Sequence, residues 1–163
     1  MVYKEHYEII FKIFTLFTNW IPYEKYNLGE LRGNFLEFLS YNYLNDIYDK
    51  SIIYQESNII LKEYKSHTWD IIVDSNQLLL YECKFSSLSL KRSHINKMIG
   101  LKNKLEKVDI FLVFYESKLK VKNNIENLQE NTKKYKFNDM LTEFNYITLE
   151  NFSEKNPFIV KHN

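Results

Sequence analysis

The stretch TWDIIVDSNQLLLYECKF, residues 68–85, decides how this chain folds. It contains two apolar runs, 71–73 and 78–81, and each is as long as a buried strand. Polar residues that favour turns occupy positions 74–76 between the two runs. The pattern predicts a β-hairpin whose strands belong to the core.

Three charged residues, Asp70, Glu82 and Lys84, fall inside these core strands. Burying a charge is costly unless it is paired or binds a metal. Side chains alternate along a strand, so Glu82 and Lys84 lie on one face, roughly 6–7 Å apart. Asp70 lies opposite Glu82 only if the connection has an odd number of residues, such as 75–77, since a two-residue turn would place it opposite Tyr81. A shared site therefore predicts a three- or five-residue connection, or a bulge.

The remaining segments predict an α/β fold with a mixed sheet between helices. The apolar spacing predicts helices over 3–20, 28–48, 92–107 and 119–135, and strands over 51–65, 69–73, 78–85, 108–115 and 145–149. The helix over 92–107 connects two strands that should therefore be parallel, with a right-handed crossover. No repeat or linker interrupts the sequence, so we expect one domain over 1–163, with 1–22 as an additional N-terminal helix.

The composition narrows the class of protein. Hydrophobic residues make up 45 % of the 163 residues, which is typical of a packed globular chain. The single cysteine, Cys83, excludes an internal disulfide and favours a reducing, cytoplasmic setting. Charged residues interrupt the apolar segment 9–21, and no long uncharged apolar run exists, so neither a signal peptide nor a membrane span is expected.

Positive charge is concentrated in one block. Residues 91–136 contain 12 Lys or Arg and 5 Asp or Glu, a net charge of +7, whereas residues 1–90 contain 8 and 12, a net charge of −4. The block either tracks a phosphate backbone or forms solvated helix faces. Charge alone leaves both interpretations open.

Asp70, eleven intervening residues and then Glu82-Cys83-Lys84, after a helix and an upstream strand, resemble the motif of the PD-(D/E)xK nuclease superfamily. The predicted order α, β, β, β, α, β over about 29–115 is similar to that family's core and covers somewhat over half of the chain. Trp69 stands where the family usually has a proline. The resemblance implies a restriction-endonuclease-like core with about four to five strands.

The resemblance also implies Mg²⁺- or Mn²⁺-dependent hydrolysis of phosphodiester bonds. Asp70, Glu82, the main-chain carbonyl of Cys83 and a glutamate of the first core helix, here Glu37, would bind the metal. Lys84 would orient the attacking water or stabilise charge on the phosphate. The expected product is a 5′-phosphate and a 3′-hydroxyl.

Glu37 fits this role conditionally. The helix over 28–48 is expected to bury an apolar arc of Leu31, Phe35, Phe38 and Leu39. Glu37 lies away from that arc, so it faces the site only if a second stripe also packs on the sheet. That stripe consists of Gly33, Ser40, Leu44 and Ile47.

Nucleic acid is the expected partner, with DNA favoured over RNA and a role in defence, repair or recombination. Lys91, Arg92 and Lys97 follow the motif and are the expected contacts to phosphate. His67 and His94 flank the motif strands and are interpreted as surface or structural histidines. A homodimer through the apolar N-terminal helix is a further expectation.

Alternatives to an active nuclease stay open. One is a catalytically silent nuclease-fold protein that binds nucleic acid or protein, and another is an α/β interaction module in which the motif is accidental. Asp70 would then be a carboxylate at a strand end, and Glu82 and Lys84 would be a solvent-facing charge pair on an edge strand. A hairpin register that sends Asp70 away from Glu82 would favour the accidental motif.

Overall fold

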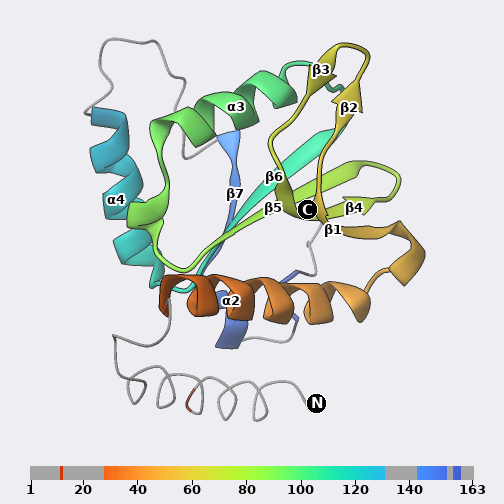
Figure 1. The fold of residues 1–163 in the computed structure, drawn as a ribbon. Coiled ribbons are helices and arrows are strands. Elements are labelled where there is room, and N and C mark those ends of the chain that lie inside the picture. The colour runs from red at the N-terminus through yellow and green to blue at the C-terminus, as the bar shows by residue number, and fades with distance from the viewer. Residues whose placement is uncertain (1–11, 13–27, 131–142, 154–155, 159–163) are drawn as a thin grey trace.

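The computed structural model describes residues 12, 28–130, 143–153 and 156–158 (Figure 1). The helices in this part are α2 (Leu28–Asn45), α3 (Arg92–Lys102) and α4 (Lys118–Glu130). The strands are β1 (Ile53–Ser57), β2 (Ile60–Leu61), β3 (Tyr64–Lys65), β4 (Trp69–Asp74), β5 (Leu78–Lys84), β6 (Val108–Phe114) and β7 (Asn145–Ile147). The helix expected over 3–20 lies outside the described residues, apart from residue 12.

Five of the strands form one mixed sheet in the order β1-β4-β5-β6-β7. β1, β4 and β5 are antiparallel neighbours, whereas β5, β6 and β7 are parallel. The parallel pairing of β5 with β6 across α3 is the arrangement expected from the sequence. The coarse prediction of an α/β fold with a mixed sheet flanked by helices is confirmed.

The single strand predicted over 51–65 is wrong. The segment contains a short 3-10 helix (Lys50–Ile52), strand β1 and a separate β2-β3 hairpin. Lys62, in the turn between β2 and β3, has a left-handed φ of 48°, and Glu56, within β1 and one residue before its end, has a φ of 43°. At the base of the hairpin, Ser66 Oγ accepts a hydrogen bond from the N–H of Ile59 at 2.9 Å. In the sequence, seven of the fifteen residues over 51–65 are isoleucine, leucine or tyrosine, a content that favoured a continuous strand.

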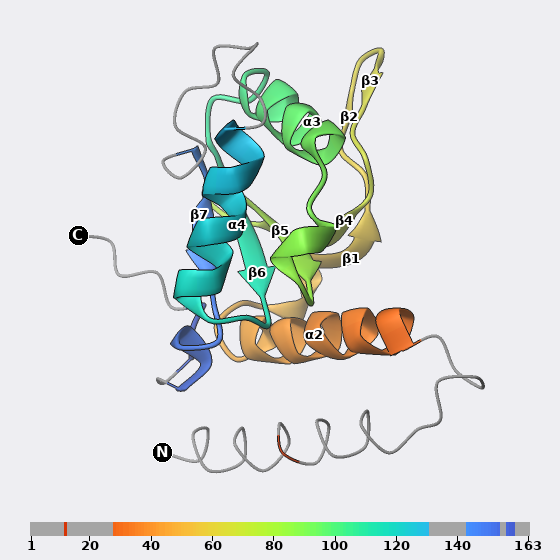
Figure 2. The same cartoon turned by 90° about the vertical axis from the view of Figure 1, so that its left-hand side faces the viewer.

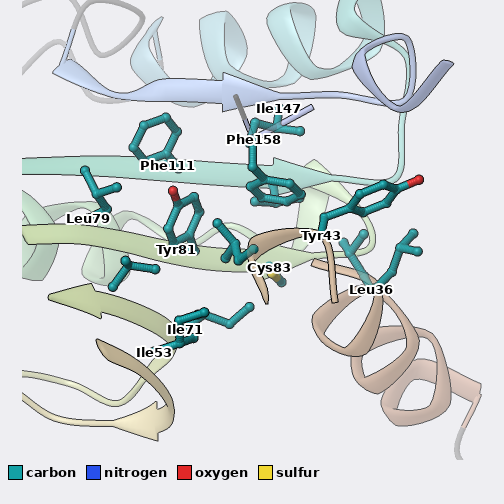
Figure 3. Close-up of a cluster of buried hydrophobic side chains, with 14 of the residues drawn as sticks. Leu36, Tyr43, Ile53, Ile71, Leu79, Tyr81, Cys83, Phe111, Ile147 and Phe158 are labelled. Carbon is teal, nitrogen blue, oxygen red and sulfur yellow. The ribbon is translucent and has the colours of Figure 1, made fainter. Parts of the chain in front are cut away.

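α2 covers one face of the sheet, and their contact forms an apolar core (Figure 3). From α2 the buried side chains are Leu36, Leu39, Ser40, Tyr43 and Leu44. The predicted arc is therefore wrong at Phe38, which is 65 % exposed, because the helix is turned toward the stripe of Ser40 and Leu44. Of the stripe on which the role of Glu37 depended, Ser40 and Leu44 are buried, whereas Ile47 lies beyond α2 and is 36 % exposed.

α3 and α4 cover the opposite face, so the sheet lies between two helical layers (Figures 1 and 2). Ile95, Met98 and Leu101 of α3 are buried there, as are Val121 and Ile125 of α4. Asp70 and Glu82 emerge from the sheet on this α3 side, since they share a strand face with the buried Ile72 and Leu80 of this core. In the described part of the chain, no helix is long and apolar enough to cross a membrane.

Candidate functional site

The register of the β4-β5 hairpin brings the charged residues of the motif together. Residues 75–77 connect the strands, and Ile71 pairs with Tyr81 and Ile72 with Leu80. One further step of the same register places Asp70 opposite Glu82, on the same face. The predicted three-residue connection is confirmed, and the register that would have favoured an accidental motif is not the one observed.

Lys84 links the two carboxylates. Its Nζ lies 2.6 Å from Oε1 of Glu82 and 3.8 Å from Oδ2 of Asp70. It also donates a hydrogen bond of 3.3 Å to the main-chain carbonyl of Cys83, while the N–H of Cys83 donates to Oδ2 of Asp70 at 2.6 Å. The side chain of Glu82 is only 7 % exposed, against 18 % for Asp70 and 22 % for Lys84. Two carboxylates and one ammonium therefore share a mostly buried site.

The electrostatics of the site separate the two carboxylates. Burial and the nearby charge of Glu82 raise the pKa of Asp70 to about 7, against the opposing effect of Lys84. Burial alone would also raise the pKa of Glu82, but His67 and Lys84 outweigh it and lower that pKa below its ordinary value. The two carboxylates raise the pKa of Lys84 although burial acts to lower it. At neutral pH the site thus holds a charged Glu82–Lys84 pair and an Asp70 near its titration point.

Glu37 of α2 interacts electrostatically with this site. Its pKa is raised, first by burial and then by the charges of Glu56 and Glu82, while Lys84 lowers it. Glu37 in turn contributes to the raised pKa of Asp70. The structure thus brings the glutamate of the first core helix into electrostatic range of the motif.

Cys83 points the other way. Its side chain lies in the apolar core under α2, where Sγ is 3.6 Å from Oγ of Ser40. Burial raises the pKa of the thiol well above its ordinary value, so it is a core group rather than a nucleophile. Only its main chain belongs to the site.

Two histidines that were interpreted as surface or structural residues, His67 and His94, border the site. Nε2 of His67 forms an ion pair of 3.4 Å with Oε2 of Glu82, and the His67 ring packs against Trp69 at an interplanar angle of 43°, with centroids 4.3 Å apart. The pKa of His94 is lowered by burial and responds to Glu82, Lys84 and His67. His67 lies in the loop before β4, and its position three residues before Asp70 was the available signal.

The residues of the site suit a hard divalent cation by their chemistry. Carboxylate oxygens of Asp70, Glu82 and Glu37 and the carbonyl of Cys83 are the oxygen ligands that Mg²⁺ and Mn²⁺ take. Oε2 of Glu82 is buried and has no hydrogen-bond partner in the described part of the chain. As the side chains stand, however, no three His, Cys, Asp or Glu residues among those described are grouped closely enough to hold a metal. The ammonium of Lys84 lies between the carboxylates instead, so binding requires it to move.

The expected nucleic-acid contacts lie on the first turns of α3. Lys91 precedes the helix as its N-cap, and Lys91 and Lys97 are both exposed, while Arg92 is half-buried. The charge of Lys91 acts on His94, which borders the site. Among the described residues, no contact joins Lys97 to the cluster around Lys84.

Comparisons with known proteins leave the chain without an assigned relative. No protein-family model matches the sequence, and no match was found among curated proteins or solved structures.

Proposed function

We propose that this protein is a metal-dependent phosphodiesterase that hydrolyses nucleic acid, with DNA favoured over RNA. The observation that carries the proposal is the β4-β5 register, which gathers Asp70, Glu82 and Lys84 on one face of the sheet. Charged residues that are buried together without full compensation are typical of functional sites.

The topology supports a restriction-endonuclease-like core for this proposal. One helix precedes three antiparallel strands of the main sheet, and a second helix then leads to a parallel strand. This is the order α, β, β, β, α, β that the resemblance to the PD-(D/E)xK superfamily implies. The β2-β3 hairpin is an insertion between the first two of these strands.

Each residue of the site has a role in this mechanism. Asp70, Glu82, Glu37 and the carbonyl of Cys83 would hold a divalent cation, which when bound lowers the pKa of a water and offsets negative charge on the phosphate. Lys84 is the compact cation that would orient the attacking water or stabilise the charge that develops on the phosphate. Its present contacts with Glu82 and Cys83 place Nζ beside the proposed ligands.

The experiment that tests this function compares the wild type with Lys84→Ala on supercoiled plasmid, linear duplex, single-stranded DNA and RNA. Each substrate is incubated with Mg²⁺, Mn²⁺ or EDTA. Lys122→Ala is the matched control, because Lys122 has an exposed side chain on α4 and the substitution removes the same charge. We expect metal-dependent cleavage by the wild type and the control, with a loss of roughly 10²–10³-fold in Lys84→Ala.

Two other results would contradict this function. Cleavage that persists in Lys84→Ala would indicate a contaminating nuclease. Metal-independent binding of DNA without cleavage of any substrate would instead indicate a catalytically silent binding module.

A further inference from the structure

Arg32, in the second turn of α2, is a cation without a carboxylate partner. Among the described residues, no Asp or Glu lies within ion-pair distance of its guanidinium. The side chain is half-buried, and its Nε is buried and has no hydrogen-bond partner in the described part of the chain. Buried polar atoms are nearly always hydrogen-bonded, so this nitrogen calls for an explanation.

An aromatic pair holds the guanidinium in place. Cζ of Arg32 lies 5.3 Å from the centroid of the Phe85 ring, within the range of a cation–π contact. The ring of Tyr115 lies 4.6 Å from that of Phe85, centroid to centroid, and both residues are half-buried. The aromatic contact offsets part of the cost of burying the charge, but it provides no acceptor for the N–H groups of Arg32. A purely structural role therefore explains where the side chain lies and leaves its donors unexplained.

Arg32 lies next to the candidate active site. Phe85, on which it packs, directly follows Lys84 at the end of β5. On the helix, a β-carbon at Gly33 would lie 3.8 Å from Oε1 of Glu37, whose pKa responds to the charge of Lys84. Arg32 is not among the charges that act on Glu37, so this carboxylate does not neutralise it. Arg32 thus adds a second positive charge near the end of β5, one that the carboxylates of the site leave uncompensated.

We propose that Arg32 binds a backbone phosphate of the nucleic-acid substrate, next to the phosphate at Lys84. The inference deepens the proposed function, on which it rests for the identity of the substrate, but phosphate binding at Arg32 needs no metal ion. A guanidinium carries its N–H donors in a planar fork that matches two oxygens of one phosphate. A phosphate bound there supplies both the acceptors and the negative charge that the guanidinium lacks. Arg32 is then a substrate-binding residue that determines where the strand lies across the site.

The test measures binding in EDTA, so that neither a metal ion nor cleavage contributes. Fluorescence anisotropy with a labelled DNA duplex, between about 50 and 200 mM salt, compares the wild type with Arg32→Met and Arg32→Lys. Methionine keeps an unbranched apolar side chain against Phe85 without the charge, and lysine keeps the charge without the fork. Lys122→Met is the matched control, because Lys122 is an exposed cation on α4. Circular dichroism and thermal melting establish that all four proteins are folded.

We expect Arg32→Met to bind the duplex roughly tenfold more weakly than wild type and to reduce the slope of log affinity against log salt by about 0.9. Arg32→Lys should keep the slope and bind about threefold more weakly, because a point charge replaces the fork. Lys122→Met should match wild type in affinity and slope. An affinity of Arg32→Met equal to that of wild type, or an equal loss in Lys122→Met, would overturn the inference.

A second measurement separates a nucleic-acid phosphate from a free anion. Thermal melting compares wild type and Arg32→Met in sodium phosphate and in sodium chloride at equal ionic strength. We expect the two salts to give the same melting temperature for each protein, because a single arginine holds a free anion only weakly. Phosphate that raises the melting temperature of wild type but not of Arg32→Met, with duplex affinity the same in both, would assign Arg32 to a free anion and overturn the inference.

The two proposals fail in different ways. Duplex binding that depends on Arg32, without cleavage of any substrate, keeps the phosphate contact and rejects the nuclease. Metal-dependent cleavage that depends on Lys84, while Arg32→Met binds the duplex like wild type, keeps the nuclease and rejects Arg32 as a phosphate contact.

Discussion

Glu116, just beyond β6, and the pair Asp70 and Glu82 are both buried carboxylate sites, yet their surroundings differ. Glu116 accepts hydrogen bonds from Oγ of Ser86 at 2.9 Å, from the N–H of Ser87 at 2.7 Å and from Oγ of Ser87 at 2.5 Å. Lys120, one turn along α4, adds an ion pair at 2.5 Å. These donors outweigh burial and lower the pKa of Glu116.

Asp70 and Glu82 are two carboxylates, yet fewer donor groups surround them than surround Glu116 alone. One ammonium, Lys84, serves both carboxylates, and Oε2 of Glu82 has no hydrogen-bond partner among the described residues. The consequence is the raised pKa of Asp70, in contrast to the lowered pKa of Glu116. The donors around Glu116 therefore join it to the loop after β5, whereas the Asp70–Glu82 site is less fully compensated, as our proposal of a bound cation requires.

The largest expected effect is on cleavage, measured after one carboxylate in each cluster is neutralised. Glu82→Gln should lower the initial rate by roughly 10²–10³-fold, because it removes a charged metal ligand next to Lys84. Glu116→Gln should stay within about threefold of wild type at a temperature at which circular dichroism shows it folded. Equal losses in the two variants would mean that the clusters do not have separate roles.

The free energy of unfolding, in contrast to the cleavage rate, should depend more on the Glu116 cluster than on the Asp70–Glu82 site. Glu116→Ala leaves the donors of Ser86, Ser87 and Lys120 without an acceptor, so we expect a loss of about 2–4 kcal/mol in the free energy of unfolding. Glu126→Ala is the control, because Glu126 is 45 % exposed and has only a 3.7 Å pair with Lys122. It should change stability by less than about 0.5 kcal/mol. Urea unfolding curves measure both, and a loss in Glu126→Ala equal to that in Glu116→Ala would contradict the structural role.

Much of the fold could be predicted from the sequence, because a long apolar run with a single hydrophobic period indicates its own helix or strand. β6 and β5 are such runs, and the helix between them requires a parallel connection. The segment 51–65 was mispredicted because its path depends on left-handed backbone angles at Glu56, near the end of β1, and at Lys62, in the turn between β2 and β3. Neither residue type signals a left-handed conformation, unlike glycine or asparagine.

The part of the site that depends on the alternation of side chains along a strand could be predicted from the sequence. The pairing of Asp70 with Glu82 followed from an odd connection. Glu37 was expected only from the family resemblance, and its role as a ligand stays a prediction. His67 could not be placed in the same way, because it lies in the loop before β4, where no period relates it to Glu82. The rotation of α2 that exposes Phe38 depends on packing against the whole sheet, which a helical wheel does not contain.

The two clusters should also differ in how their contributions to folding stability depend on pH, which is a smaller effect. The pKa of Asp70 rises from its ordinary 3.8 to about 7 in the folded protein, so its contribution to stability falls as pH rises between these values. The pKa of Glu116 lies below its ordinary 4.5, so its contribution is present above that pH and is lost as pH falls through the lowered value. The two carboxylates therefore give stability opposite dependences on pH.

Thermal melting of metal-free protein checks this opposition. Asp70→Asn should melt about 2–5 °C above wild type near pH 8, on the order of 1–2 kcal/mol, and should match it near pH 4. Glu116→Gln should melt at a lower temperature than wild type at neutral pH, and this difference should disappear only under acidic conditions. A constant offset of Asp70→Asn across the whole pH range would show that ionisation of Asp70 costs the fold nothing.

The smallest effects should come from lysines outside both clusters. Lys91 and Lys97 are exposed on α3, and their substitution by alanine should leave the melting temperature unchanged. If they contact phosphate, each variant should bind duplex DNA a few-fold more weakly and reduce the slope of log affinity against log salt by about 0.9. Fluorescence anisotropy with a labelled duplex in EDTA, between about 50 and 200 mM salt, measures this slope without cleavage. Lys122→Ala removes the same charge from α4, so an equal change of slope in that variant would assign DNA binding to the general charge of the chain rather than to the surface beside the site.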